Sequence, residues 1–301
     1  MPVYSWLASP RETRDVLDRH GLTTKHRLGQ NFLISDAIIG KILDLAELHD
    51  TDVVFEVGPG IGTLTVAMLP LAGAVVSVEA DRSLKDVLAE TCARDSERFA
   101  LEMGDALHVD GTQLRDAVAS LGIDGLDPMP NKLVSNLPYQ VAATLVLQVF
   151  EQMPSIERAV VMVQAEVADR MTAVPGSKTY GGYTTKLALF ARPTGRFEVG
   201  PNNFMPPPHV DSAVIRLDRS PVCHPLTGQP LSQEQIAWCC QVIDAAFAQR
   251  RKTIRNSMAA SGFEKDSLDI AFEQAGINPK ARAETLAPTD FVRLSCALEM
   301  R

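Results

Sequence analysis

The 301-residue sequence lacks any apolar run long enough to cross a bilayer. Its first 20 residues carry Arg11, Glu12, Arg14 and Asp15 and have no apolar core, so they do not have the pattern of a signal peptide. We therefore expect a cytoplasmic protein with no membrane partner.

Cysteine is scarce as well, with five residues and no C-x-x-C spacing among them. This scarcity excludes a disulfide framework and gives no support to a zinc site. Free thiols suit a reducing cytosol, and we predict no metal centre.

Positive charge is in short supply, because 29 Lys and Arg face 37 Asp and Glu, for a net charge of −8. Phosphate binding needs clustered cations, so this balance argues against a general nucleic-acid binder. We accordingly expect no DNA partner.

Two local clusters of cations are exceptions to this balance. They are Lys25 with Arg27, and the group Arg250, Arg251, Lys252 and Arg255. The second cluster falls on an expected helix at 250–260, where Arg251 and Arg255 are four residues apart and share one face. We predict that both clusters contact a phosphate backbone, and a solvated surface is the alternative.

One glycine-rich stretch dominates what the sequence does contain, VVFEVGPGIGTLT at residues 53–65. It opens with the apolar, β-branched run of a buried parallel strand, passes through three glycines and continues as an amphipathic helix. Strand, glycine turn and helix bring a backbone close to a nucleotide-like ligand, an approach that a Cβ at Gly58 or Gly60 would hinder. A tight turn without a ligand is the alternative, because a glycine motif alone is weak evidence.

The spacing of this stretch favours S-adenosylmethionine over a dinucleotide. The dinucleotide fingerprint is G-x-G-x-x-G, whereas Pro59 here removes an N–H group that a pyrophosphate would bind. Glu56 would repel a pyrophosphate but can reach an ammonium group. A nucleoside that carries an amino acid fits both features.

Two carboxylates follow the next expected strands. Glu79 ends a strand at 74–78 and lies 21 residues past Gly58, the position from which an acidic side chain accepts ribose hydroxyls. Asp105 follows a strand at 99–103 and can accept a hydrogen bond from an adenine amino group. Each carboxylate is alternatively the N-cap of the next helix.

The residues Asn136, Leu137, Pro138 and Tyr139 close a fourth expected strand and indicate a second substrate. The Asn136 oxygen and the Leu137 carbonyl can accept the two N–H bonds of an exocyclic amine. Tyr139 can stack on an extruded base. Phe204, which opens a stiff proline-rich loop, is expected beside it. A strand-terminating turn is the alternative.

Gln30 and Asn31 lie in a polar and basic loop ahead of the glycine-rich strand. They are either turn formers or part of a lid over the ligand.

The order of these patterns predicts an α/β fold. Residues 1–218 are expected to form a Rossmann-like domain that binds S-adenosylmethionine, with residues 1–24 as an N-terminal extension. Prolines and a glycine without periodicity indicate a linker at 219–231. The pattern at 232–301 is helical, which predicts a small all-helical domain.

Seven motifs in this order resemble a known family. They are LGQNFL at 28–33, EVGPGIG at 56–62, EA at 79–80, GDAL at 104–107, NLPY at 136–139, FMPPPHVDS at 204–212 and QRRKT at 249–253. The set is similar to the ribosomal RNA adenine N6-dimethyltransferases of the small ribosomal subunit. The acidic net charge departs from that family, whose members are often basic.

The resemblance implies that residues 1–218 are a methyltransferase domain and that residues 232–301 bind RNA. It also implies the cofactor and the site. S-adenosylmethionine is the expected cofactor, and the residues implied in binding it are Gln30, Asn31, Leu33, Glu56, Gly58, Gly60, Glu79, Ala80, Asp105, Ala106 and Asn136. The implied catalytic residues are Asn136, Leu137, Pro138, Tyr139 and Phe204.

The resemblance also implies the substrate, two adjacent adenosines near the 3′ end of 16S rRNA in the assembling small subunit, each dimethylated at N6. That subunit is the expected partner, and a monomer is expected. The reaction would be an in-line displacement in which N6 attacks the methyl carbon, aided by two acceptors and without a metal. Three alternatives stay open: an erythromycin-resistance enzyme that modifies large-subunit RNA, an NAD-dependent oxidoreductase, and a non-catalytic assembly factor.

Overall fold

The computed structural model describes residues 3–22 and 30–298. The chain forms two compact units: unit 1 comprises residues 1–168 and 193–218, and unit 2 comprises residues 169–192 and 219–301. The sequence predicted one boundary at residue 218, whereas residues 169–192 also belong to unit 2. Linear composition does not reveal this, because Tyr180 in that segment contacts Phe247 and Leu286 far along the chain.

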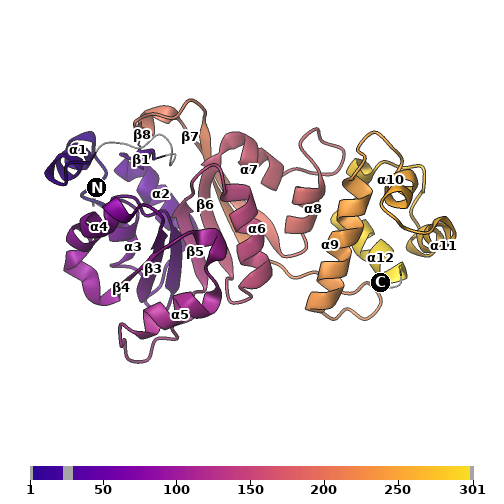
Figure 1. Cartoon of the computed structure of the whole chain (residues 1–301), viewed down its shortest axis with the longest axis horizontal. Coiled ribbons are helices and arrows are strands. Elements are labelled where there is room, and N and C mark those ends of the chain that lie inside the picture. The colour runs from indigo at the N-terminus through magenta and orange to yellow at the C-terminus, as the bar shows by residue number, and fades with distance from the viewer. Residues whose placement is uncertain (1–2, 23–29, 299–301) are drawn as a thin grey trace. The chain divides into compact units, whose positions relative to one another are not determined.

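Unit 1 is built on a seven-stranded sheet (Figure 1). Its strands in spatial order are β4 (Phe99–Met103), β3 (Ala74–Glu79), β2 (Val53–Val57), β5 (Lys132–Asn136), β6 (Arg158–Gln164), β9 (Ser212–Arg219) and β7 (Ala191–Val199). Neighbouring strands from β4 to β6 are parallel, and β9 runs antiparallel to β6. The predicted α/β class is therefore confirmed.

The strand order reverses at β2. The chain places β3 and β4 on one side of β2, and β5 and β6 on the other. Such a reversal opens a crevice beyond the carboxyl ends of the two central strands, where open α/β sheets bind ligands. Gly58 follows β2 directly and Asn136 ends β5, so the two most informative motifs of the sequence meet at this crevice.

Helices alternate with these strands. They are α1 (Pro10–Arg19), α2 (Asp36–Ala46), α3 (Thr65–Met68), α4 (Lys85–Thr91), α5 (Gly111–Ala119), α6 (Ala142–Gln152) and α7 (Ala165–Met171). Short 3-10 helices add η2 (Arg82–Leu84), η3 (Ala93–Arg98), η4 (Ala106–His108) and η5 (Pro201–Asn203). A separate antiparallel pair, β1 (Phe32–Leu33) with β8 (Phe204–Met205), was not predicted.

One core cluster packs α2 and α3 onto one face of the sheet. It joins Ile39 and Ile42 of α2 and Met68 of α3 to Val54 of β2 and Val134 of β5. Successive side chains of a strand point to opposite faces, so residues two positions from these valines share their face. Glu56 therefore shares the face of Val54, and Asn136 shares the face of Val134.

Unit 2 is helical. Its helices are α8 (Gly182–Leu187), α9 (Gln233–Phe247), α10 (Ile254–Ala260), α11 (Lys265–Ala275) and α12 (Pro288–Ala297), with η6 (Ala283–Thr285) before the last. Phe247 stacks on Phe291 with ring centroids 5.6 Å apart, and the Trp238 indole N–H donates to the Ser295 carbonyl at 3.0 Å. These contacts join α9 to α12. None of the helices in the described residues is long and apolar enough to span a membrane.

The start of α10 differs from the prediction of a helix at 250–260. The Thr253 hydroxyl accepts a hydrogen bond from the Asn256 N–H at 3.4 Å, which caps a helix that begins at Ile254. Arg251 therefore lies in a turn before the helix. The prediction that Arg251 and Arg255 share a helical face is wrong, because a capping threonine interrupts the helix between them.

Candidate active site

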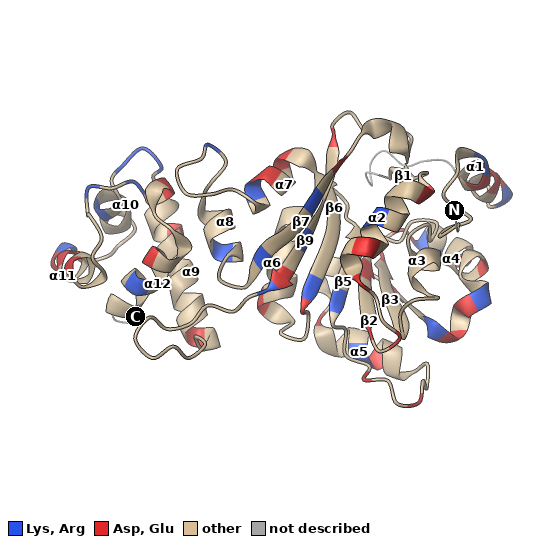
Figure 2. Cartoon of the chain, turned by 180° about the vertical axis from the view of Figure 1, so that it is seen from behind, with Lys and Arg blue, Asp and Glu red and all other residues tan. Residues whose placement is uncertain are grey.

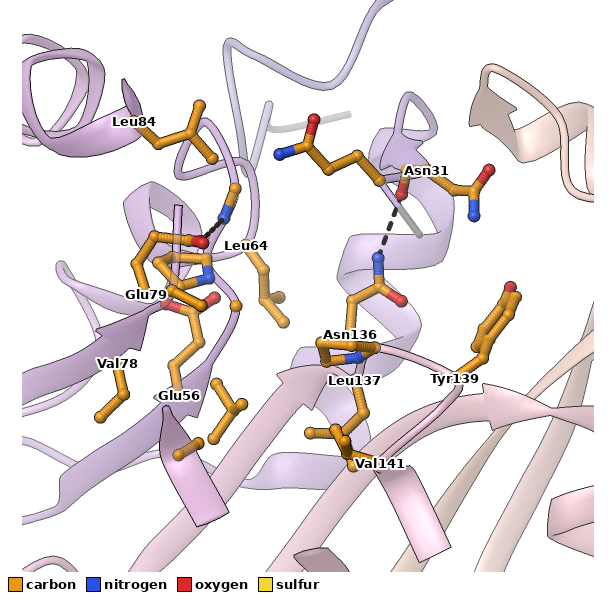
Figure 3. A pocket seen from close by; sticks show the side chains of 18 of the residues that line it. Asn31, Glu56, Leu64, Val78, Glu79, Leu84, Asn136, Leu137, Tyr139 and Val141 are labelled. Carbon is orange, nitrogen blue, oxygen red and sulfur yellow. Dashed lines mark hydrogen bonds between the residues drawn. The ribbon is translucent and has the colours of Figure 1, made fainter. Parts of the chain in front are cut away.

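A cavity of about 480 Å³ lies at the carboxyl ends of the central strands. Fourteen of the residues expected in the site line it: Gln30, Asn31, Leu33, Glu56, Gly58, Gly60, Glu79, Ala80, Asp105, Ala106, Asn136, Leu137, Pro138 and Tyr139. Figure 3 shows the carboxylates of Glu56 and Glu79 on one side of the cavity and Asn136 and Tyr139 on the other. Its volume suits a nucleoside-sized ligand.

The glycine loop after β2 has the backbone that the sequence predicted. Gly58 and Gly60 have φ angles of +66° and +62°, in the left-handed region that other residues rarely adopt. A Cβ on Gly58 would come within 3.3 Å of the Pro138 ring, and one on Gly60 within 3.1 Å of the Phe32 ring. The loop therefore lies close to two other segments that line the cavity, those of Phe32 and Pro138.

Glu79 ends β3 and holds the glycine loop. Its carboxylate accepts hydrogen bonds from the Gly60 N–H at 3.2 Å and from the Asp81 N–H at 2.8 Å. Burial raises the pKa of Glu79, although these backbone donors oppose the change. A carboxylate has about four acceptor positions, so Glu79 retains capacity for ribose hydroxyls, its predicted partner.

Glu56 is buried under the same loop, with only 2% of its surface exposed. One carboxylate oxygen accepts hydrogen bonds from the Thr65 and Ser77 hydroxyls at 2.7 and 2.8 Å. Burial raises the pKa of Glu56 to about 7, with a smaller contribution from the Glu79 charge, and the two hydroxyls oppose this. The predicted contact with an ammonium group would stabilise the ionised form.

Asp105 caps η4, as the alternative interpretation of this residue expected. One carboxylate oxygen accepts a hydrogen bond from the Leu107 N–H at 3.0 Å, and the other lies 3.3 Å from Nδ1 of His108. The side chain is exposed and also borders the cavity. Contact with an adenine amino group stays a prediction.

Asn136 and Leu137 present acceptors at the end of β5. The Asn136 amide nitrogen donates to the Asn31 carbonyl at 3.4 Å, and this contact turns its oxygen toward the cavity (Figure 3). The Leu137 N–H donates to the Met162 carbonyl at 3.1 Å. Among residues 3–22 and 30–298, neither the Asn136 side-chain oxygen nor the Leu137 carbonyl accepts a hydrogen bond. Both acceptors that the sequence assigned to an exocyclic amine are thus available.

Tyr139 lines the cavity beside these acceptors. Its hydroxyl lies 2.6 Å from the Ser212 hydroxyl on β9, and burial raises its pKa. The hydrogen bond holds the ring in place. Stacking of this ring on a base stays a prediction.

Phe204 does not line this cavity, contrary to expectation. It is 2% exposed and belongs to the core cluster that includes Leu33 and Val199. The reason is the unpredicted pairing of β1 with β8, which aligns Phe204 with Leu33. In this arrangement Phe204 supports the cavity wall and cannot stack on a base.

Thr63 is a cavity residue that the sequence did not single out. The residue borders the cavity, but its hydroxyl oxygen is enclosed by protein and has no hydrogen-bond partner among the described residues. Buried polar groups are rarely unpaired in the absence of a ligand. Its position directly after Gly62, in the glycine-rich stretch, was the one sequence feature that placed it near the ligand.

The predicted RNA contacts fall in two places. Lys25 and Arg27 lie outside the described residues. Arg250, Arg251 and Lys252 form an exposed basic segment between α9 and α10, blue in Figure 2.

The four cations of the second cluster differ in whether a carboxylate lies nearby. Arg255 makes two hydrogen bonds to Asp269, at 2.5 and 2.6 Å, which corrects the expectation that phosphate explains this residue better than intramolecular pairing. Arg250 lies 3.8 Å from Glu284. Arg251 and Lys252 have no ion-pair partner within the described part of the chain.

Comparison with known proteins identifies the family. Residues 21–299 match the model of a family described as ribosomal RNA adenine dimethylase. The chain belongs to this family. It is 39% identical over 298 residues to ribosomal RNA small subunit methyltransferase A of Streptomyces coelicolor, an alignment that covers 98% of each chain. Membership confirms the predicted methyltransferase and S-adenosylmethionine as its cofactor.

Solved structures show the same fold at lower identity. A dimethyladenosine transferase from Plasmodium falciparum has a TM-score of 0.69 and 23% identity, covering 87% of this chain and 95% of that one. A 23S rRNA methyltransferase, ErmE, has a TM-score of 0.65 and 24% identity, covering 89% and 99%. Fold similarity therefore does not separate the two rRNA substrates.

The cavity fits the family's cofactor. The glycine loop leaves room where a Cβ would intrude, and Glu56 and Glu79 provide carboxylates for a cationic nucleoside.

Proposed function

We propose that this adenine dimethylase methylates N6 of two adjacent adenosines near the 3′ end of the 16S rRNA in assembling small subunits, twice each. The observation that carries the proposal is the pair of available acceptors, the Asn136 oxygen and the Leu137 carbonyl, at the switch point beside the carboxylate-lined half of the cavity. The small-subunit substrate is supported by the near full-length similarity to enzymes named for that subunit. The proposal includes a monomer in the cytoplasm.

S-adenosylmethionine supplies an electrophilic methyl group. The adenine amine is a weak nucleophile because its lone pair is conjugated with the ring. Hydrogen bonds from N6 to Asn136 and Leu137 would favour a tetrahedral nitrogen and disperse its developing positive charge. Tyr139, held by Ser212, would fix the base plane so that N6 is aligned for attack. The N6 proton leaves to water after transfer.

The exposed segment of Arg250, Arg251 and Lys252 is the proposed contact with the rRNA backbone. RNA is recognised largely through phosphates and shape, which suits unpaired cations. We expect that replacing Arg251 and Lys252 with Ala will flatten the salt dependence of subunit binding, by roughly 0.7–0.9 per lost contact in the log–log slope. Arg255→Ala is the matched control, because Asp269 already pairs with that guanidinium. An equal change of slope in the control would remove the segment from the RNA contact.

Methyl transfer to purified immature subunits tests the function itself. We expect dimethyladenosine at two adjacent 16S positions with small subunits, and none with large subunits. Modification of large-subunit RNA would support the erythromycin-resistance type. Binding of subunits without transfer would support an assembly factor.

A further inference from the structure

Gln164 is a cavity residue whose polar atoms the proposed reaction does not use. It ends β6, is partly buried and lines the cavity. Its carboxamide makes no hydrogen bond to any residue in the described ranges 3–22 and 30–298. A glutamine amide carries two N–H donors and a carbonyl acceptor, so Gln164 has hydrogen-bonding capacity for a ligand that enters the cavity.

Strand register places Gln164 beside the acceptors for the target amine. Asn136 is aligned with Met162 on β6, and Gln164 lies two residues further along the strand, on the same face as Met162. Ser212 on β9 is aligned with Gln164 and holds the Tyr139 hydroxyl. Asn136, Gln164 and Tyr139 therefore come from adjacent elements and border one part of the cavity.

The chemistry of this part is complementary to adenine. The Asn136 oxygen and the Leu137 carbonyl are acceptors, and they match the two hydrogens of N6. The ring nitrogens that flank N6, namely N1 and N7, are acceptors and need a donor. Two cavity residues near Asn136, Gln140 and Gln164, carry amide donors that make no hydrogen bond to the described residues. Of these two, Gln164 lies on the strand paired with β5, two residues beyond the partner of Asn136, and can supply that donor.

We propose that Gln164 donates a hydrogen bond to a ring nitrogen of the target adenine, N1 or N7, and so orients N6 toward the methyl group. The inference rests on the proposed function and adds a specificity-determining residue to it. The bond would hold the base in one rotational setting about the stack with Tyr139. It would also disfavour bases that carry a ring N–H at that position, because two donors would then face each other.

The test uses the full-length protein and reconstituted small subunits that carry adenosine, 1-deazaadenosine or 7-deazaadenosine at the target position. Single-turnover methyl transfer is measured for the wild type and for Gln164→Leu. We expect Gln164→Leu to lower the rate with adenosine roughly 10- to 100-fold, the scale for losing one such contact. With the analogue that lacks the contacted nitrogen, wild type and variant should differ by less than about threefold, since there is no bond left to lose.

Two controls separate this from a structural effect. Gln152→Leu makes the same substitution at an exposed position on α6 and should leave the rate unchanged. Gln164→Glu keeps the size but removes the donor, and should lose rate with adenosine as Gln164→Leu does.

Two outcomes would overturn the assignment: an unchanged rate with adenosine, or an equal loss on all three substrates. Failure of the wild type on adenosine would instead contradict the proposed function, so the two failures are distinguishable.

Discussion

The two ends of the sheet in unit 1 use the same strands in opposite ways. At the amino end, Lys132 of β5 pairs with Asp52 at 2.7 Å, and Arg158 of β6 pairs with Asp218 of β9 at 2.7 Å. At the carboxyl end, β5 and β6 finish in Asn136 and Gln164, which line the cavity. Within the described residues, the Asn136 side-chain oxygen and the Gln164 carboxamide take part in no hydrogen bond. The charged groups at the first end are therefore satisfied within the protein, whereas the second end keeps hydrogen-bonding capacity for a ligand.

The ion-paired amino end of the sheet, called the paired end from here on, also caps the C-terminus of α2. Its last carbonyls, at Ala46 and Glu47, accept hydrogen bonds from Lys132 and Arg158, and Glu47 itself has a left-handed φ of 47°. Burial would raise the pKa of Asp218, but hydrogen bonds from Arg216 and Arg158 outweigh it and lower the pKa to about 2. Cations at a helix C-terminus are favourable, so this network joins the helix to three strands.

The largest effect on stability is expected at the paired end. Lys132 and Asp52 expose only 8% and 6% of their side chains, so Lys132→Met leaves a buried carboxylate without its cation. We expect a loss of roughly 3–5 kcal/mol in the free energy of unfolding, measured by urea titration. Adding Asp52→Asn should restore part of it. A loss no greater than that of a surface substitution would contradict the contrast between the two ends.

A matched pair of asparagines, Asn131 just before β5 and Asn136 at its end, tests the contrast directly. Asn136→Ala should lower methyl transfer roughly 10²–10³-fold, because it removes one preorganised contact to the reacting amine, and should change stability little. Asn131→Ala should do the reverse, since its amide donates to Asp52 at 2.8 Å and its oxygen accepts from the Val53 N–H at 3.0 Å. Single-turnover methyl transfer and urea unfolding, measured on both variants, test whether the two effects are separate. Near wild-type turnover in Asn136→Ala would remove that residue from the mechanism.

A second matched pair concerns two glutamates. Glu79→Ala should weaken S-adenosylmethionine binding by roughly 1.5–3 kcal/mol, the value of hydrogen bonds to a charged acceptor. Glu47→Ala at the paired end should leave that affinity unchanged, although it removes the partner of Arg158 and Arg216. Calorimetry on both variants measures this. Unchanged affinity in a folded Glu79→Ala would mean that the ribose assignment is wrong.

A smaller effect than those of the substitutions above is expected on changing the pH, and it should be traceable to Glu56. The folded-state pKa of Glu56 is about 7, against an ordinary value of 4.5, so the folded state holds the proton longer than the unfolded chain. Its contribution to stability therefore falls as the pH rises from about 4.5 to 7. A cationic ligand favours the ionised form, so its affinity should rise with pH, by up to about tenfold per unit below pH 7. Glu56→Gln should flatten both curves, and an identical slope in that variant would exclude Glu56 as the titrating group.

Much of the fold and the site could be predicted from the sequence. The central strands, the glycine turn and the strand-end residues Glu79 and Asn136 follow from local patterns. A buried strand needs a short apolar, β-branched run, and a turn with positive φ needs glycine. Both features therefore depend on residues that are neighbours in the sequence. Because parallel strands end at the same edge, a polar residue after each of them predicts a shared site.

Other features depended on contacts between distant segments, and only the tertiary structure decided them. Phe204 is buried because β8 pairs with β1, and Arg255 is paired because α11 brings Asp269 to it. Gln164 stands out only once the sheet places it two residues beyond Met162, the strand partner of Asn136, and the described residues give its amide no hydrogen bond. A local pattern determines which face of a strand a side chain occupies, whereas strand pairing and helix packing determine which polar groups remain for a ligand.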